Sequence, residues 1–143
     1  MANNATTHID LFDRTVQETH GWLGEVMSES GLRDRHYALQ ALRSVLHALR
    51  DELSVEQNAG LSAQLPTMIR GLYFEGWVPS RSVEHTSRET FVRKIHRTFM
   101  GYAEPFDVDR IITGVLAVLE RRLTDECRKI RATLPKDLRE LWP

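Results

Sequence analysis

One phrase of this sequence occurs twice. Residues 63–73 read Ala-Gln-Leu-Pro-Thr-Met-Ile-Arg-Gly-Leu-Tyr, and residues 132–142 read Ala-Thr-Leu-Pro-Lys-Asp-Leu-Arg-Glu-Leu-Trp. Aligning the chain with itself on this phrase pairs residues 22–73 with residues 91–142, and the aligned apolar positions stay apolar. Self-similarity of this length is typical of a fold built from two copies of one supersecondary unit. We therefore predict two homologous repeats, at about 22–73 and 91–142.

The apolar spacing inside each repeat is helical. Apolar residues recur at 38, 42, 45, 46, 49 and 53 in the first repeat, and at 108, 112, 115, 116, 119 and 123 in the second. Steps of three and four residues place these side chains on one helix face, which predicts helices over about 34–53 and 107–123. Because the sequence shows no alternating strand pattern of useful length, we predict an all-α fold of seven or eight helices.

Proline and capping residues mark the predicted helix ends. Proline disfavours helical geometry in the residue before it and suits the first turn of a helix. Each Leu-Pro pair should therefore end one short helix and start the next. We also predict one long opening helix from about Thr7 to Glu29, terminated by Gly31 and carrying Ile9, Phe12, Val16, Leu23, Val26 and Met27. Further predicted caps are the Ser54/Gln57 box, the Thr86/Glu89 box, Asp107 and Thr124.

The length and composition fit a single domain. The chain has 143 residues, of which 41% are apolar and 27% charged, as in ordinary soluble domains. We predict one domain over 1–143. It consists of the long helix with repeat 1 in 1–75, a linker in 76–86 and repeat 2 in 87–143.

Cysteine usage and the N-terminal residues favour a cytoplasmic protein. A single cysteine forms no internal disulfide and fits none of the usual four-ligand zinc frameworks. The first eight residues lack the basic start and apolar run of a signal peptide. The longest apolar stretch, around 111–119, is too short to span a bilayer. We expect a cytoplasmic location, no membrane contact and no cofactor.

Four segments of the chain share a pattern with a known family. They are Ala41-Leu-Arg-Ser-Val-Leu-His-Ala-Leu-Arg-Asp-Glu-Leu53, Ala63-Gln-Leu-Pro66, Ile69-Arg-Gly-Leu-Tyr-Phe-Glu-Gly-Trp77, and the closing Leu134-Pro135 with Leu138-Arg-Glu-Leu-Trp-Pro143. In these residues the chain resembles bacterial proteins of the domain of unknown function family 2267, over nearly its whole length. The resemblance implies a small helical domain and supplies no catalytic residues.

The two predicted central helices end with opposite charges. Arg50-Asp51-Glu52 closes the first, and Glu120-Arg121-Arg122 closes the second. All three charges invert while the neighbouring apolar positions persist. We therefore predict that these ends form contacts, either with each other or between chains. Aromatic residues near the linker, namely Phe74, Trp77 and Tyr73, are further contact candidates, although Tyr73 and Trp77 suit a core equally well.

Matched glutamates and arginines offer a second candidate site. Glu56 and Glu126 begin the third helix of each repeat, and Arg70 and Arg139 lie in the proline-started helices. An arginine fork binds carboxylate or phosphate, so these pairs would suit an anion. Their equal use in both repeats favours the alternative, which is a structural role at helix ends.

The C-terminal half is basic. Residues 88–143 hold 12 Lys+Arg and 9 Asp+Glu, whereas residues 1–87 hold 7 and 11. A nucleic-acid backbone could follow the cluster formed by Arg121, Arg122, Arg128, Lys129 and Arg131. The near-neutral net charge and the lack of interleaved aromatic residues favour a solvated face instead.

Cys127 is the weakest candidate site. It lies in the first turn of a predicted helix beside Arg128 and Lys129, where the helix dipole and the cations would lower a thiol pKa. Redox sensing is therefore one interpretation. The matching residue in the first repeat is Gln57, which favours an inert thiol.

The sequence shows no constellation typical of an enzyme. It contains no Ser or Cys nucleophile set beside a base, no glycine-rich phosphate loop and no catalytic carboxylate pair. Its histidines show no metal-ligand spacing. We therefore predict a non-enzymatic helical module that binds a protein partner or its own copies. Nucleic-acid binding and redox sensing remain as alternatives.

Overall fold

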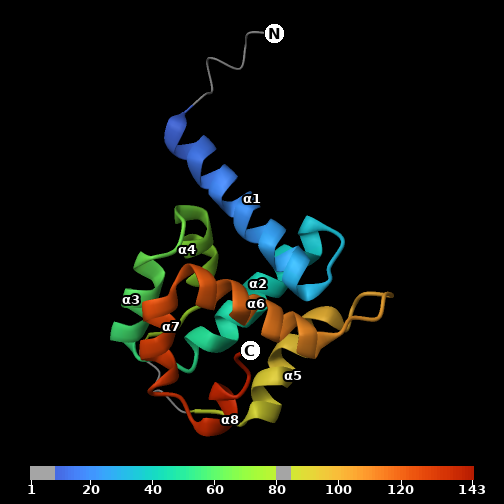
Figure 1. The fold of residues 1–143 in the computed structure, drawn as a ribbon, viewed down its shortest axis with the longest axis vertical. Helices are drawn as coiled ribbons and strands as arrows, with labels where there is room; N and C mark the ends of the chain where they lie inside the picture. Colours follow the sequence, from blue (N-terminus) through green and yellow to red (C-terminus); the bar gives the residue numbers. More distant parts are fainter. Residues whose placement is uncertain (1–8, 80–84) are drawn as a thin grey trace.

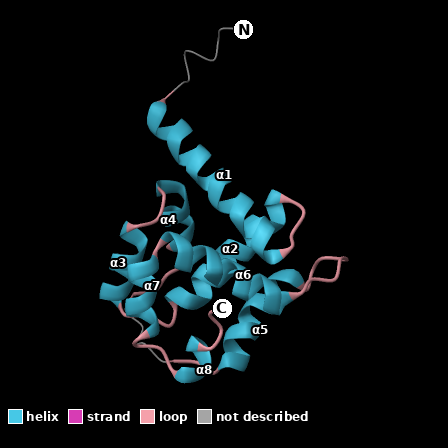
Figure 2. Cartoon of the chain, in the orientation of Figure 1, coloured by secondary structure: helices cyan, strands magenta, loops and turns pink. Residues whose placement is uncertain are grey.

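The computed structural model describes residues 9–79 and 85–143. In chain order the helices of this part are α1 (Asp10–Ser30), α2 (Arg35–Arg50), α3 (Val55–Ala63), α4 (Thr67–Tyr73), α5 (Arg88–Phe99), α6 (Val108–Arg122), α7 (Thr124–Arg131) and α8 (Lys136–Arg139). The described residues contain no strand (Figure 2). The predicted all-α class and helix number are confirmed. The predicted helix start at Thr7 and positions 80–84 of the predicted linker lie outside the described residues.

Both halves of the chain contribute to one apolar core. The central helices α2 and α6 pack on each other, α1 packs on α6, and α2 packs on α5 (Figure 1). The first helix of each half therefore contacts the second helix of the other half. Leu49 on α2 and Leu119 on α6 are both fully enclosed. This crossed packing agrees with two repeats, and the duplication itself stays a prediction.

Local signals set several helix ends. Ser54 and Gln57 form the predicted capping box, in which the Ser54 hydroxyl accepts the Gln57 amide at 3.2 Å and the Gln57 side chain accepts the Ser54 amide at 2.9 Å. The Asp107 carboxylate caps α6 by accepting the Arg110 amide at 3.1 Å. Gly31 ends α1 with a φ of 67°, a conformation that costs other residues more than glycine. These three ends are confirmed.

The two Leu-Pro pairs turn the chain between helices. Pro66 precedes α4 and Pro135 precedes α8, each at the N-cap. The leucines before them, Leu65 and Leu134, are buried. Each pair therefore ends one helix, anchors the turn in the core and starts the next helix, as predicted.

Two predicted caps are wrong. Ser87, and not Thr86, caps α5, because the Thr86 hydroxyl donates instead to the carboxylate of Glu52 at 2.7 Å. Thr124 lies inside α7, where its hydroxyl donates to the Glu120 carbonyl at 2.8 Å. In both cases the threonine hydroxyl, to which the sequence pattern assigns a capping role, donates a hydrogen bond to an acceptor elsewhere.

Helix α1 extends beyond the core. Its N-terminal half stands clear of the other helices in Figure 1, apart from a tie to α4 in which the Met68 amide donates to the Thr15 hydroxyl at 3.0 Å. We call residues 9–18 the stalk. Although α1 has 21 residues, no helix in 9–79 or 85–143 is both long and apolar enough to cross a membrane.

Candidate interaction surface

Residues at steps of three and four positions along α1 place their side chains on one face of the helix. The residues of this face are Phe12, Val16, Thr19, Leu23, Val26 and Ser30, and the N-cap residue Ile9 precedes them at the same spacing. Such heptad spacing is typical of a helix that packs lengthwise against another element. From Thr19 onward the face is buried, whereas Ile9, Phe12 and Val16 are 49%, 58% and 39% exposed. We call these three residues the seam, because they continue a buried face into solvent.

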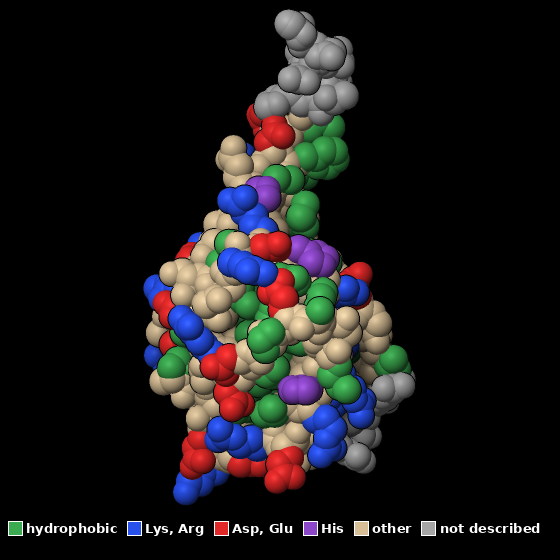
Figure 3. Space-filling model, turned by 90° about the vertical axis from the view of Figure 1, so that its right-hand side faces the viewer, with side chains coloured by type: hydrophobic (Ala, Val, Ile, Leu, Met, Phe, Trp, Pro, Cys, Tyr) green, Lys and Arg blue, Asp and Glu red, His purple; other side chains and the backbone are tan. Residues whose placement is uncertain are grey.

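The stalk gathers exposed apolar side chains. Half of the large, exposed apolar residues of the described chain lie on it, namely Leu11 and the three seam residues. Figure 3 shows hydrophobic side chains along one edge of the projecting helix. Exposed apolar residues that stand singly, such as Val55, are normal, whereas a contiguous group marks a contact site. The stalk is therefore the strongest candidate surface in the described structure.

At the first charge-inverted end, at the C-terminus of α2, Arg50 and Glu52 are internal, whereas Asp51 is exposed and pairs with Arg50 at 3.0 Å. Arg50 is 6% exposed, and its guanidinium donates to the carbonyls of Tyr73 and Glu75 at 2.9 and 2.7 Å. Glu52 is 1% exposed, and its carboxylate accepts the amide and hydroxyl of Thr86 at 3.1 and 2.7 Å. These two side chains hold the end of α4 and the start of α5. They are not available to a second chain.

The second end, at the C-terminus of α6, faces α1. Arg121 pairs with Glu25 and Glu29 at 3.0 and 3.2 Å. Arg122 pairs with Glu25 and lies over the Trp22 ring, 5.0 Å from its centroid. Partial burial opposes ionisation of Glu25, but the hydrogen bonds from Arg122 and Arg121 outweigh it and lower the Glu25 pKa. The prediction that the two charged ends pair with each other is wrong, because each end has its own neighbours.

The predicted basic cluster is neutralised within the chain. Besides Arg121 and Arg122, it contains three cations on α7. Their pairs are Arg128 with Asp125, Lys129 with Glu126, and Arg131 with Glu120. Each of the five cations therefore has an acidic partner. This arrangement weakens the case for phosphate contacts at this face, since a nucleic acid would have to compete with these carboxylates.

The aromatic candidates divide into core and surface. Tyr73 is fully buried, and its hydroxyl donates to the Asn58 side chain. Phe74 and Trp77 are half-buried and contact each other with ring centroids 5.0 Å apart. Phe74 and Trp77 therefore stay contact candidates, and Tyr73 is a core residue.

Among the described residues, neither matched arginine contacts its matched glutamate. The Arg70 guanidinium donates to the Ser62 and Leu65 carbonyls at 2.8 and 3.1 Å, and so caps the end of α3. Glu126 pairs with Lys129, and Glu56 is exposed in the first turn of α3. Arg139 makes no comparable side-chain contact within the described residues. The observed contact of Arg70 is the structural alternative named above.

Cys127 is an internal thiol. Its side chain is fully buried, and this burial raises the thiol pKa to about 11. The predicted lowering by the helix dipole and by Arg128 and Lys129 is wrong, because loss of solvation dominates. Among the described residues, no group of three or more His, Cys, Asp or Glu side chains is placed to hold a metal ion.

We expect Cys127 to resist thiol–disulfide exchange with an aromatic disulfide reagent in the folded protein. Reaction with a thiol reagent at pH 7 should be roughly a hundredfold or more slower than in the urea-unfolded chain, because the buried thiol is neither ionised nor accessible. The rate of 5-thio-2-nitrobenzoate release measures this difference. Rapid labelling of the native protein would contradict the burial and restore the redox hypothesis.

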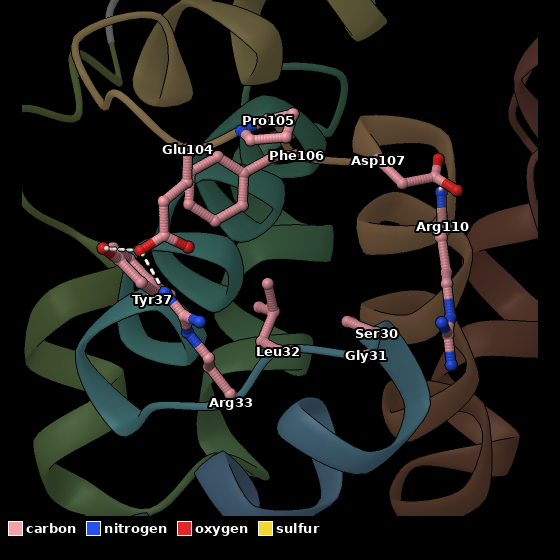
Figure 4. A pocket seen from close by; sticks show the side chains of 10 residues that line it. All are labelled: Ser30, Gly31, Leu32, Arg33, Tyr37, Glu104, Pro105, Phe106, Asp107 and Arg110. Atoms are coloured by element: carbon pink, nitrogen blue, oxygen red, sulfur yellow. Dashed lines mark hydrogen bonds and ion pairs between the residues drawn. The ribbon is translucent and has the colours of Figure 1, made fainter.

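A cavity of about 280 Å³ lies between the α1–α2 loop and the α5–α6 loop. At one end the Glu104 carboxylate accepts hydrogen bonds from Arg33 and from the Tyr37 hydroxyl (Figure 4). The Tyr37 ring also packs edge-on against Phe106, with ring centroids 5.0 Å apart. These polar groups satisfy one another and join the two loops, which is a structural function.

Helix α5 carries cations that the sequence prediction did not single out. Arg88, Arg93, Lys94 and Arg97 form no ion pair with any described acid, and Glu89 is the one acidic residue of the helix. A local count of charge along residues 88–99 would have found this surplus. The predicted basic cluster rested instead on cations close together in sequence, and the fold pairs those cations with acids.

Comparison with known proteins gives a family and no activity. No curated protein matches the chain. A family model described as "Uncharacterized conserved protein (DUF2267)" matches residues 19–141. The match spans α2 to α8 entirely, together with the second half of α1. The chain therefore belongs to the DUF2267 family of uncharacterized conserved proteins.

Proposed function

We propose that the protein is a helical interaction module whose role is to bind a protein chain through the seam of the stalk. The observation that carries this proposal is the continuity of one helix face, which is buried from Thr19 onward and exposed at Ile9, Phe12 and Val16. A helix needs an apolar face only where it packs. The exposed part of the face is therefore best explained by a contact with another chain.

The energetics support a reversible contact. Full burial of a large apolar side chain contributes about 1.5 to 3 kcal/mol, and the seam residues leave about half of their surface in water. Covering three of them would supply a few kcal/mol before the cost of association. That gain does not exceed the cost of association by itself, so the partner must add further apolar and polar contacts around the seam.

Replacement of the seam tests this function. Tagged wild-type protein, the double variant Phe12→Ser with Val16→Ser, and the control Val55→Ser would be purified from the native cell under identical conditions. Val55 is 53% exposed on α3, so its substitution removes a similar apolar group elsewhere. Bound proteins, including an untagged copy of this chain, would be quantified by mass spectrometry.

The proposal predicts a partner that the seam variant loses and the Val55 variant retains. Because seam residues are exposed, thermal unfolding of the double variant should match that of wild type closely. Equal recovery of every bound protein with all three chains would contradict the proposal.

A further inference from the structure

We infer that the partner of the seam is a single amphipathic α-helix of a different protein, which packs lengthwise along the stalk. This inference rests on the proposed function and names the kind of partner that the seam binds. The spacing of the seam, its width and the helices that cover the rest of the same face support it.

The spacing of the seam is that of a helix–helix contact. The steps from Ile9 to Phe12 and from Phe12 to Val16 are three and four residues, and the same alternation continues through Thr19 to Ser30. Side chains that recur on average every 3.5 residues stay in contact with one neighbouring helix over several turns. An extended segment lying on the stalk would not require this repeat. The spacing therefore favours a helix as the partner.

Helices of the same chain already cover the other half of this face. Helix α6 runs antiparallel to α1, since Gly114 lies against the backbone of Ser30 and the guanidinium of Arg122 lies over the Trp22 ring. Because α6 ends at Arg122, its packing on α1 stops near Trp22. The seam thus continues a helix-packing interface beyond the end of the helix that forms it.

The seam is narrower than the buried part of the face. In the buried part Trp22 and Met27 widen the apolar surface, and both α6 and α2 pack on α1. On the stalk the apolar stripe is one residue wide at each step, and Leu11 lies off it. A narrow stripe of this kind is the seam that one helix covers, whereas a wider stripe faces a core. The partner is therefore one helix and not a broad surface.

A second stalk is too short to be this helix. Self-associating coiled coils typically extend over about three to four heptads, whereas the exposed seam, from Ile9 to Val16, covers little more than one. A helix of another protein can be longer and can reach past the seam. Met68, which is 42% exposed, lies at that side, because its amide donates to the Thr15 hydroxyl at 3.0 Å. Such a helix would gain apolar contact with Met68 in addition to the seam.

Crosslink mapping from the three seam positions tests the inference. A photoreactive phenylalanine analogue would replace Ile9, Phe12 or Val16, one at a time, in the full chain inside the native cell. Glu18 is exposed on the opposite face of α1 and provides the control position. Tandem mass spectrometry of the crosslinked peptides would identify the residue of the partner that each position attaches to.

The residues attached from positions 9 and 16 should lie about seven apart in the partner sequence, with the residue attached from position 12 between them. The seam rises about 10 Å along α1 over these seven residues, and a helix alongside it rises equally per residue. A strand would cover the same length in about three residues. Position 18 should attach to this protein at least tenfold less than position 12.

A proline in the attached segment of the partner provides a second measurement. Proline in a helix interior removes a hydrogen bond and clashes with the preceding turn. It should therefore weaken binding to this chain at least tenfold, compared with alanine at the same position of the partner. Binding of purified proteins would be measured by isothermal titration calorimetry.

Several results would overturn the inference and leave the proposed function intact. They are attached residues about three apart or without order along the partner, equal attachment from positions 12 and 18, and a proline variant that binds like the alanine variant. Crosslinks to residues 9–18 of a second copy would also overturn it, since the partner would then be another stalk. If none of the three seam positions attaches to a specific protein, the proposed function fails together with this inference.

Discussion

We expect Leu49→Ala and Leu119→Ala each to lower the free energy of unfolding by about 2 to 5 kcal/mol. Leu49 lies on α2 and Leu119 on α6, at 1% and 0% exposure, where the two central helices meet the rest of the core. Each truncation removes buried apolar surface and leaves a cavity that the surrounding side chains fill only in part. Urea unfolding followed by circular dichroism measures the change.

A leucine on the stalk provides the matched control. Leu11 is 54% exposed, so Leu11→Ala should change the free energy of unfolding by no more than about 0.5 kcal/mol. If Leu49→Ala or Leu119→Ala has an effect as small as that of Leu11→Ala, the packing of the central helices described above is incorrect.

We expect Gly114→Val to destabilise the protein by roughly 1 to 3 kcal/mol or more. Gly114 is buried in α6 against the end of α1, and a Cβ atom there would overlap the Ser30 hydroxyl and lie 3.0 Å from the backbone of Glu29 and Ser30. Valine adds two further methyl groups at this contact. The helices must therefore separate, which disturbs the largest packing surface of α1.

A second glycine separates packing from helix propensity. Gly24 lies in α1, where an added Cβ atom would meet nothing within 4 Å beyond the neighbouring backbone of its own helix, so Gly24→Ala should stabilise the protein by up to about 1 kcal/mol. Gly114→Ala changes propensity equally but adds the close contact, and should give a lower unfolding midpoint than Gly24→Ala. Equal stabilisation by both alanines would show that α1 and α6 do not approach closely at Gly114.

Local signals in the sequence predicted much of the fold. The Ser54/Gln57 box, the Asp107 cap, the Gly31 terminator and the two Leu-Pro turns involve residues at most a few positions apart. Their geometry depends on the chain around them, so short-range rules describe it well. The apolar stripes of α2 and α6 also predicted these helices, since apolar residues recur there with the period of a helix.

The errors share one physical cause, which is competition from distant partners. Thr86 does not cap α5, because its hydroxyl donates to Glu52, which lies 34 residues away in sequence. Cys127 lies in an electropositive local setting, yet burial among residues from elsewhere in the chain dominates its pKa. Arg50 and Glu52 resembled surface residues in the sequence, but the turn after α4 and the start of α5 enclose them. Such partners are set by the fold and not by the neighbouring sequence.

The sequence predicted the candidate surface only in part. The sequence placed Ile9, Phe12 and Val16 on one helix face, but it gave no sign that this half of the helix leaves the core. The lengths of the other helices determine how far along α1 they pack against it, and this extent is a property of the assembled fold. The stalk is therefore recognisable only from the difference in burial between the two halves of α1.

Site-specific photo-crosslinking tests the central claim most directly. A photoreactive phenylalanine analogue would replace Phe12 in the full chain inside the native cell, with Val55 replaced in a control. We predict crosslinks from position 12 to one specific protein chain, and few or none from position 55. Crosslink products that are equally weak and unspecific at both positions would contradict the claim that the seam is a contact surface.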